Sequence, residues 1–405
     1  MLWIGGGLLA LFFTLRIFVA DLYRVDSGSM EPTIHGGDSW DEWVLVWYAG
    51  TEDLERFDLV VAYSDVGELV VKRVVGLPGE NIQILGGDLF VDGKRLSAND
   101  PRPGVVVLFD SELQSLEAEF RMEASHWTES SDGWVLDTRG KPVDYELNTL
   151  HWLSGFDDGY LLPDSTSVEG SRAVNDGGLE LDVEFLESAG VLRIDLREEG
   201  DLFRASFLLN DESTDEEQLE LTVRIERFRI VANTKDVFGA SVLAEPEILV
   251  EQAFTIDAES AHPLHFSNID NTVFLSLGSK LSLAHTYSDN RLPEGVAVAP
   301  GKTIGAQVAV GGDGLHARFT NLRVVRDFNW ISRGEFGVER PISLGPGEYF
   351  LLGDNSFQSL DGRTWGATRK SEILGRPLKV IWPRERARSL SGDHWRRVAR
   401  PASSN

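Results

Sequence analysis

Two short segments carry side chains that could together cleave a peptide bond. The first, "VDSGSMEPTIHGGD" at residues 25–38, presents Ser29 in a turn. Gly28 allows unusual backbone angles there, and Pro32 restricts the chain just beyond the serine. The second segment, "VVKRVVGLPG", carries Lys72 between pairs of valines. A serine hydroxyl beside a neutral amine would be a nucleophile paired with its own general base.

Lys72 is flanked by Val70 and Val71 on one side and by Val74 and Val75 on the other, as in a buried strand. Burial disfavours the charged ammonium and lowers the lysine pKa, to about 7–8 in tuned catalytic lysines. The neutral amine can then take the serine proton, which is the Ser-Lys variant of the catalytic triad. Each segment alone has an ordinary alternative, a turn for the first and an exposed edge-strand lysine for the second.

These segments belong to a series of motifs that resembles signal peptidase I. In that family a transmembrane helix leads through R-x-F into a "SGSMxPT" box. A "GD" turn, a strand, a "KRVVGLPGD" box and a late "GDNxxxSxDSRxWG" box follow. This chain has, in the same order, "LRIFVADLYRVDSGSMEPT" (15–33), "HGGD" (35–38), "ERFDLVVAY" (55–63), "KRVVGLPGE" (72–80) and "GDNSFQSLDGRTWG" (353–366). The resemblance covers about residues 1–96 and 345–383.

The resemblance implies a role for each matched residue. Ser29 matches the nucleophile and Lys72 the general base. Ser27 matches the serine whose hydroxyl forms the oxyanion hole with the Ser29 backbone N–H. Ser359 matches the serine that orients the lysine. The remaining supporting residues of the late box are the ion pair of Asp361 and Arg363, and Asp354 in the Gly-Asp-Asn turn.

The resemblance also implies where a substrate would bind. The substrate would add as a strand alongside residues 23–25 and 70–72, with small side chains in two shallow pockets. The expected substrate contacts are Tyr23, Val25, Val70 and Val71. Three positions depart from the family pattern: Asp26 before the first box, Gln358 in the late box, and Gly362 in place of the serine between Asp361 and Arg363.

The start of the chain is apolar from residue 2 to residue 20, apart from Thr14 and Arg16. About 20 helical residues span the hydrocarbon core of a bilayer, so residues 2–20 predict a transmembrane helix within an anchor domain at 1–22. A cleavable signal peptide is the alternative. The lack of a basic n-region argues against it, and so does Phe18, which stands where a small residue is expected.

The middle of the chain has a different pattern. Apolar and polar residues alternate in "LELDVEF" (179–185), and again at 192–196, 203–207 and 219–225. This period predicts antiparallel strands with one solvent-facing side, and hence a β-sandwich. The segment "GLHARFTNLRVVRDF" (314–328) resembles the last strand of concanavalin A-like (lectin and laminin-G-like) sandwiches.

The predicted fold is therefore mainly β, with a catalytic β-domain split by an inserted antiparallel sandwich. Short β-branched runs punctuated by Gly and Pro predict strands on both sides of the insertion. After the anchor, we expect the N-terminal segment of the catalytic domain at 23–104 and the sandwich at 105–340. The C-terminal segment of the catalytic domain is expected at 341–390, followed by a flexible tail at 391–405.

Charge and composition exclude several functions. Residues 97–340 carry 44 Asp and Glu against 20 Lys and Arg, whereas the rest of the chain has 21 acids and 18 bases. So acidic a region repels nucleic acid and anionic lipid, or serves only solubility. The chain has no cysteine, which excludes disulfides and cysteine-metal sites. Apart from the loose His262/His265 pair, the eight histidines lack zinc-site spacing, so neither a metal nor another cofactor is expected.

Together these features predict a membrane-bound serine endopeptidase that removes signal peptides from exported preproteins. The anchor would hold the catalytic domain at the outer face of the inner membrane. The expected partners are preprotein signal peptides and the lipid bilayer, but not nucleic acid. One alternative is a specialised processing protease of the same clan with few substrates. Another is an inactive membrane-anchored binding protein that acts through the sandwich, whose own role could be that of a spacer or of a sugar- or peptide-binding domain.

Overall fold

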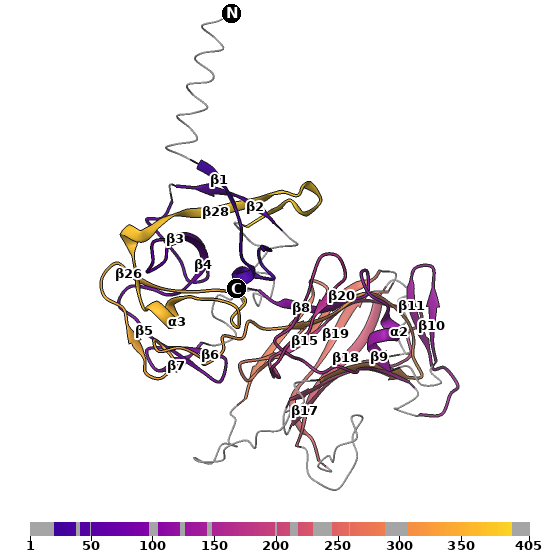
Figure 1. Cartoon of the computed structure of the whole chain (residues 1–405). Helices are drawn as coiled ribbons and strands as arrows, with labels where there is room; N and C mark the ends of the chain where they lie inside the picture. Colours follow the sequence, from indigo (N-terminus) through magenta and orange to yellow (C-terminus); the bar gives the residue numbers. More distant parts are fainter. Residues whose placement is uncertain are drawn as a thin grey trace, which may run out of the picture. The chain divides into compact units, whose positions relative to one another are not determined.

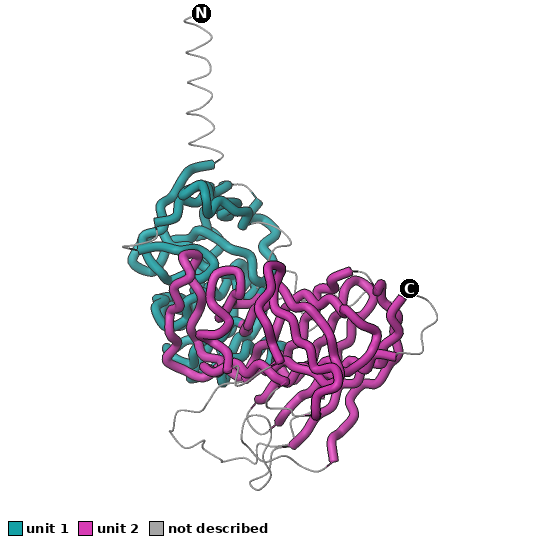
Figure 2. Tube along the Cα trace, turned by 90° about the vertical axis from the view of Figure 1, so that its right-hand side faces the viewer, with its two compact units in different colours: residues 1–104, 328–398 teal, residues 105–327, 399–405 magenta. Residues whose placement is uncertain are grey.

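The computed structural model describes residues 20–37, 41–48, 50–96, 104–121, 126–143, 148–198, 201–210, 218–229, 245–258, 260–287 and 307–390. Its strands pair antiparallel, as the sequence predicts (Figure 1). The chain divides into two compact units (Figure 2). Unit 1 contains residues 1–104 and 328–398, and unit 2 contains residues 105–327 and 399–405.

The main sheet of unit 1 has eight strands, which come from segments before and after the inserted region. Its strands, in sheet order, are β1 (Ala20–Arg24), β2 (Trp43–Trp47), β28 (Ile373–Trp382), β3 (Leu59–Tyr63), β4 (Leu69–Gly76), β26 (Glu348–Leu352) and β27 (Thr368–Arg369), with β29 (Arg388–Ser389) paired to β28. Strand β28 lies between β2 and β3, and β26 pairs with β4. Segments on both sides of the middle region therefore form one sheet.

A smaller sheet completes unit 1. Its strands, in sheet order, are β25 (Ile342–Ser343), β5 (Asn81–Leu85), β6 (Asp88–Val91) and β7 (Lys94–Arg95). Asp92 and Gly93, which connect β6 to β7, have φ values of 51° and 75°. A two-residue hairpin of the type I′ form needs positive φ at both positions, and the Asp-Gly pair is favoured there because it tolerates these angles.

Unit 2 contains two large antiparallel sheets. One has the order β10 (Trp127–Ser130), β11 (Gly133–Asp137), β24 (His316–Arg326), β15 (Gly177–Phe185), β20 (His262–Ile269), β21 (Thr272–Leu277) and β22 (Leu281–Thr286), with β8 (Val106–Asp110) also on β24. The other has the order β19 (Glu247–Asp257), β18 (Gln218–Arg229), β17 (Asp201–Leu209), β16 (Gly190–Glu198), β23 (Gln307–Asp313), β12 (Thr149–Trp152) and β9 (Phe120–Arg121). The short helix α2 (Leu116–Glu119) precedes β9, and β13 (Tyr160–Leu161) pairs with β14 (Ser167–Val168).

The two large sheets share one core. In β18 the side chains of Leu219, Leu221, Val223 and Ile225 are buried, and the residues between them are partly or fully exposed. Their cluster also contains Leu179, Phe266 and Phe319 from the first sheet. The predicted sandwich is therefore confirmed, because alternate residues of both sheets meet in a common interior.

Unit 1 differs from the predicted boundaries at two places. Strand β1 begins at Ala20, within the range predicted as anchor, because Ala20–Arg24 pairs with β2. Residues 328–340, predicted to belong to the sandwich, group with unit 1. Phe328, Trp330 and Ile331 are 5%, 4% and 4% exposed and make contacts within that unit, described below.

Other predictions fall outside the described residues. These are the transmembrane helix, except for its last residue, and the tail at 391–405. Among the residues that the structure describes, no helix has the length and apolar character needed to cross a membrane.

Candidate active site

Ser29 lies in a single helical turn, η1 (Gly28–Met30), shortly after β1. Met30 and Ile34 are 1% and 0% exposed and pack in a core cluster with Val44 of β2. Ser29 itself is only partly buried. The buried neighbours therefore fix the turn while leaving the serine partly accessible to solvent.

Lys72 reaches this turn from strand β4. Its Nζ lies 2.8 Å from Ser29 Oγ, within hydrogen-bonding distance. The lysine is 2% exposed, and burial lowers its pKa to about 8, although the carboxylates of Asp361 and Asp354 act in the opposite direction and Arg363 adds to the lowering. A lysine with this pKa is partly neutral near pH 8, so it can act as a base towards Ser29.

Arg73, the next residue of β4, is directed away from Ser29 because successive side chains of a strand alternate in direction. The guanidinium is 1% exposed, and its Nε donates to Asp354 Oδ1 at 2.7 Å. It also donates to the carbonyl of Phe57, and Thr33 Oγ1 donates to the Asp354 carboxylate. Arg73 is not among the residues predicted from the sequence, although it adjoins Lys72 in the same motif.

A second buried ion pair joins Asp361 and Arg363, which are 0% and 2% exposed. Arg363 donates to both carboxylate oxygens, at 2.9 and 2.7 Å. It also donates to Ser356 Oγ and to the backbone oxygens of Ser356 and Ile331. Asp361 in turn accepts from the backbone N–H groups of Gly353 and Arg363. The pair thus braces the loop that precedes the short helix α3 (Gly362–Trp365).

Substitution Asp361→Asn is expected to reduce the free energy of unfolding of unit 1 by about 3–5 kcal/mol, because Arg363 would keep its buried charge without its partner. Glu251→Gln is the matched control, because the pair of Glu251 with Arg224 is exposed and contributes about 0–1 kcal/mol. Hydrogen exchange of the β4 and β26 amides measures the difference. Equal protection in the two variants would contradict a bracing role.

The remaining two predicted serines lie in different surroundings. Ser27 is exposed, and its hydroxyl donates to Ser29 Oγ at 3.3 Å. Ser359 Oγ donates to the carbonyl of Leu360 at 3.4 Å, and the described residues include no hydrogen bond from it to Lys72. The structure thus brings Ser27 to Ser29, whereas the roles predicted for Ser27 and Ser359 stay predictions.

Close packing explains why Gly362 stands where the family pattern has a serine. A Cβ at this position would lie 2.8 Å from the carbonyl oxygen of Leu351 and 2.9 Å from the ring of Phe350. Distances below 3 Å require these buried neighbours to move. The glycine thus lets helix α3 approach strand β26 closely, where a serine would not fit.

The predicted substrate contacts lie on β1 and β4, or immediately beside them. Strand β1 is the end strand of its sheet and pairs only with β2 among the described strands. Strand β4 lies between β3 and β26, but β26 pairs only with Arg73 and the residues after it. Among the described residues, Val70 and Val71 therefore pair with β3 on one side and with no strand on the other. Val25 is buried, and its N–H donates to the carbonyl of Glu42, while Tyr23 bonds to Tyr48 through the two hydroxyls.

The segment at 328–336, which we call the strap, packs against both ion pairs. The ring of Phe328 lies 5.3 Å from the Arg73 guanidinium, and Ile331 accepts from Arg363. Trp330 Nε1 donates to the carbonyl of Gly353, and the Ile331 N–H donates to Ser356 Oγ. At its far end, the N–H groups of Glu335 and Phe336 donate to the carbonyl of Arg363. No pattern in the sequence predicts these contacts.

Comparison with solved structures leaves the fold family of unit 2 open. A carbohydrate-binding module of Bacillus subtilis, CBM66, aligns with 50% of this chain and 93% of its own at 12% identity and a TM-score of 0.28. A β-glucanase of Bacillus licheniformis aligns with a TM-score of 0.28 at 13% identity, covering 56% of this chain and 95% of its own. Scores this low do not assign unit 2 to a family, so the concanavalin A-like assignment stays a prediction.

Comparison of sequences is informative for unit 1. Signal peptidase I of Bacillus caldolyticus is 37% identical over 100 residues, which is 25% of this chain and 54% of that protein. Signal peptidase I P of Bacillus subtilis subsp. natto is 34% identical over 114 residues, 27% of this chain and 60% of that protein. The matches therefore span only about half the length of these relatives. The family described as signal peptidase, peptidase S26, matches residues 2–126 and 309–382. On this match and these relatives, the chain belongs to the signal peptidase I family, peptidase S26.

Proposed function

We propose that this protein is a membrane-bound serine endopeptidase that cleaves signal peptides from exported preproteins with a Ser-Lys dyad. The observation that carries the proposal is the 2.8 Å approach of a buried Lys72 Nζ to Ser29 Oγ. A hydroxyl next to an amine of lowered pKa is an activated nucleophile. Membership of the signal peptidase I family supports signal peptides as the substrates.

In the proposed reaction, neutral Lys72 accepts the hydroxyl proton of Ser29 as the serine oxygen attacks the scissile carbonyl carbon. The resulting oxyanion is stabilised by the Ser27 hydroxyl and the Ser29 backbone N–H. The Lys72 ammonium then gives its proton to the leaving amine, and the peptide bond breaks to leave an acyl-enzyme. Lys72 next takes a proton from water as the water oxygen attacks the ester carbon. The ester C–O bond then breaks, and the Lys72 ammonium returns the proton to the Ser29 oxygen, which frees the acid product and restores both side chains.

The substrate is proposed to bind as an extended strand between β1 and the first half of β4. Both offer backbone groups on an edge without a partner strand among the described residues. Main-chain bonding of this kind positions a cleavage site without requiring a particular side chain at every position. Signal peptides of many sequences could therefore share one site.

Attachment to the cell membrane, with unit 1 on its outer side, is part of the proposal. The apolar run at residues 2–20 supports it. A group of exposed apolar side chains on β1, β2 and β28 adds support, because these strands carry Leu22, Trp43, Trp47 and Trp382, which are 38–54% exposed. Trp43 pairs with Trp382, so their side chains share one face of the sheet. Tryptophan is enriched where proteins meet the membrane interface.

Incubation of the detergent-solubilised protein with a preprotein that carries A-x-A before its junction tests the function. Cleavage at that junction is expected, and Ser29→Ala should abolish it. Ser171→Ala, which removes an exposed hydroxyl of unit 2, should cleave like the parent. Full cleavage by Ser29→Ala would refute the assigned nucleophile, and no cleavage by the parent protein would favour an inactive binding protein instead.

A further inference from the structure

A pocket of about 400 Å³ lies on unit 2, at a gap along one edge of β24. Strand β11 pairs with β24 as far as Phe319, and β8 pairs with it only from Arg323 onward. The residues between these two partners, Thr320–Leu322, contribute to the lining. Asn321 has a φ of 52°, so the strand is irregular at this gap. The volume lies within the range of small-ligand sites.

The buried side chains of the pocket lining are apolar and aromatic, whereas most of the surface that the pocket presents is polar. Its buried lining residues are Leu116, Trp127, Leu150, Phe319 and Leu322. The rings of Trp127 and Phe319 pack at a centroid distance of 4.9 Å. Trp134, half-buried, also lines the pocket and adds a second indole. A ligand that enters can therefore bury a flat or apolar group against aromatic rings.

The polar lining combines the two carboxylates of Glu112 and Glu129 with the hydroxyls of Ser111, Ser130, Ser131 and Thr320 and the amide of Asn321. Glu112 and Glu129 are exposed carboxylates, and the ion pairs of the described residues include neither. Ser130 Oγ already donates to the carbonyl of Gly133, and Asn321 Nδ2 donates to Asp182. The carboxylates and the Asn321 oxygen are left as acceptors.

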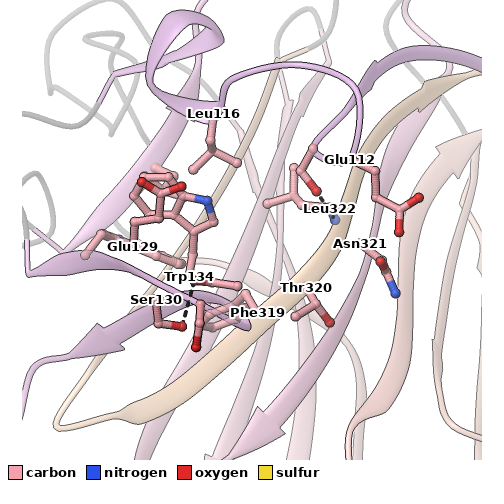
Figure 3. A pocket seen from close by; sticks show the side chains of 14 residues that line it. Glu112, Leu116, Glu129, Ser130, Trp134, Phe319, Thr320, Asn321 and Leu322 are labelled. Carbon is pink, nitrogen blue, oxygen red and sulfur yellow. Dashed lines mark hydrogen bonds between the residues drawn. The ribbon is translucent and has the colours of Figure 1, made fainter.

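The charge of the site has one sign. Among the described residues, its lining contains two glutamates and no Lys, Arg or His, and it belongs to a region with 44 acidic and 20 basic residues. Figure 3 shows Glu129 with Trp134 at one end of the pocket, and Glu112 with Asn321 at the other. A concave site of this charge repels anions and attracts cations.

We propose that this pocket binds an arginine side chain of an extended basic peptide. Guanidinium is planar, carries five donors and no acceptor, and stacks on aromatic rings. It thus matches a site with acceptors at both ends and aromatic rings between them. A neutral saccharide would also stack on an indole and could bond to the hydroxyls of the lining, but it carries no positive charge to pair with Glu112 and Glu129.

The binding can be measured on the full-length protein with a fluorescent Gly-Arg-Gly-Arg-Gly peptide, titrated by anisotropy. Binding is expected to saturate and to weaken as salt rises, because charges at a surface pocket are screened. The matched peptide carries citrulline in place of arginine, which keeps the shape and removes the charge. Glu112→Gln and Glu129→Gln should each weaken binding roughly tenfold. Glu169→Gln, which changes an exposed carboxylate outside the pocket lining, should leave binding unchanged.

Three results would overturn the proposal. One is no saturable binding of the arginine peptide up to millimolar concentration. Another is loss of the dependence on charge or on the pocket. Equal binding of the citrulline peptide would make the interaction independent of charge, and equal binding by the two glutamate variants and the parent protein would place it elsewhere. The third is displacement of the peptide by cellotetraose at lower concentration than by unlabelled peptide, which would assign the pocket to a neutral saccharide.

Discussion

Replacement of Lys72 by alanine is expected to lower the rate of peptide cleavage by roughly 100- to 10,000-fold, the contribution of a positioned general base. Lys72→Arg should be no more active, because a guanidinium stays protonated and cannot accept the proton of Ser29. Initial rates on a short peptide with A-x-A before the cleaved bond measure both. Unchanged activity in Lys72→Ala would mean that another group deprotonates the serine.

The pH dependence of the parent enzyme provides a second test of Lys72. Burial lowers its pKa to about 8, so the neutral amine forms as pH rises through that value. The cleavage rate should rise about tenfold per pH unit below 8 and level off above it. The Asp361 carboxylate raises the lysine pKa, so Asp361→Asn should move the inflection to lower pH. An inflection near pH 4 would instead implicate a carboxylate.

Measuring the free energy of unfolding of a Lys72 variant shows whether its inactivity comes from the missing base or from unfolding. The pKa of Lys72 is lower in the folded protein than the ordinary value of 10.5, so the unfolded chain binds more protons between about pH 8 and 10.5. The charged lysine therefore destabilises unit 1 at neutral pH, and this cost disappears as pH rises through that window. Lys72→Met should be inactive yet no less stable than the parent at pH 7.

Two deletions that differ by residues 328–340, which contain the strap, are expected to give opposite results. Removal of residues 105–327, with a short Gly/Ser linker from Gly104 to Phe328, should leave a protease that still cleaves peptides. The ends of unit 2 lie on neighbouring strands, since Val106 pairs with Arg326, and loop length costs entropy only logarithmically. Removal of 105–340 should yield an inactive and less stable protein.

The physical reason lies in the buried contacts of the strap. The longer deletion takes away three buried side chains, Phe328, Trp330 and Ile331, and the carbonyl that accepts from Arg363. Truncation of a buried aromatic residue typically costs about 3–5 kcal/mol. Trp330→Ala in the full-length chain should therefore reduce both melting temperature and activity. Similar activity in the two deletions would show that the strap is dispensable.

The sequence determined much about this protein locally. The order of its motifs predicted Ser29 and Lys72 as a pair, because a serine-bearing turn and a valine-flanked lysine are each specified by a few consecutive residues. The structure brings the two side chains within 2.8 Å, and their catalytic roles stay predictions. Period-two alternation predicted the sandwich, since strand side chains alternate between core and solvent. The helical anchor at 2–20 remains a prediction of the same local kind.

The tertiary structure decided what depends on residues far apart in the chain. Arg73 and Asp354 are 281 positions apart, and no local pattern reveals that their buried charges meet. The strap could not be separated from the sandwich by composition, because its burial depends on contacts with Gly353, Ser356 and Arg363. The lowered pKa of Lys72 has the same origin. It follows from how completely the folded chain excludes water from the amine, and that exclusion is a property of packing rather than of any one segment.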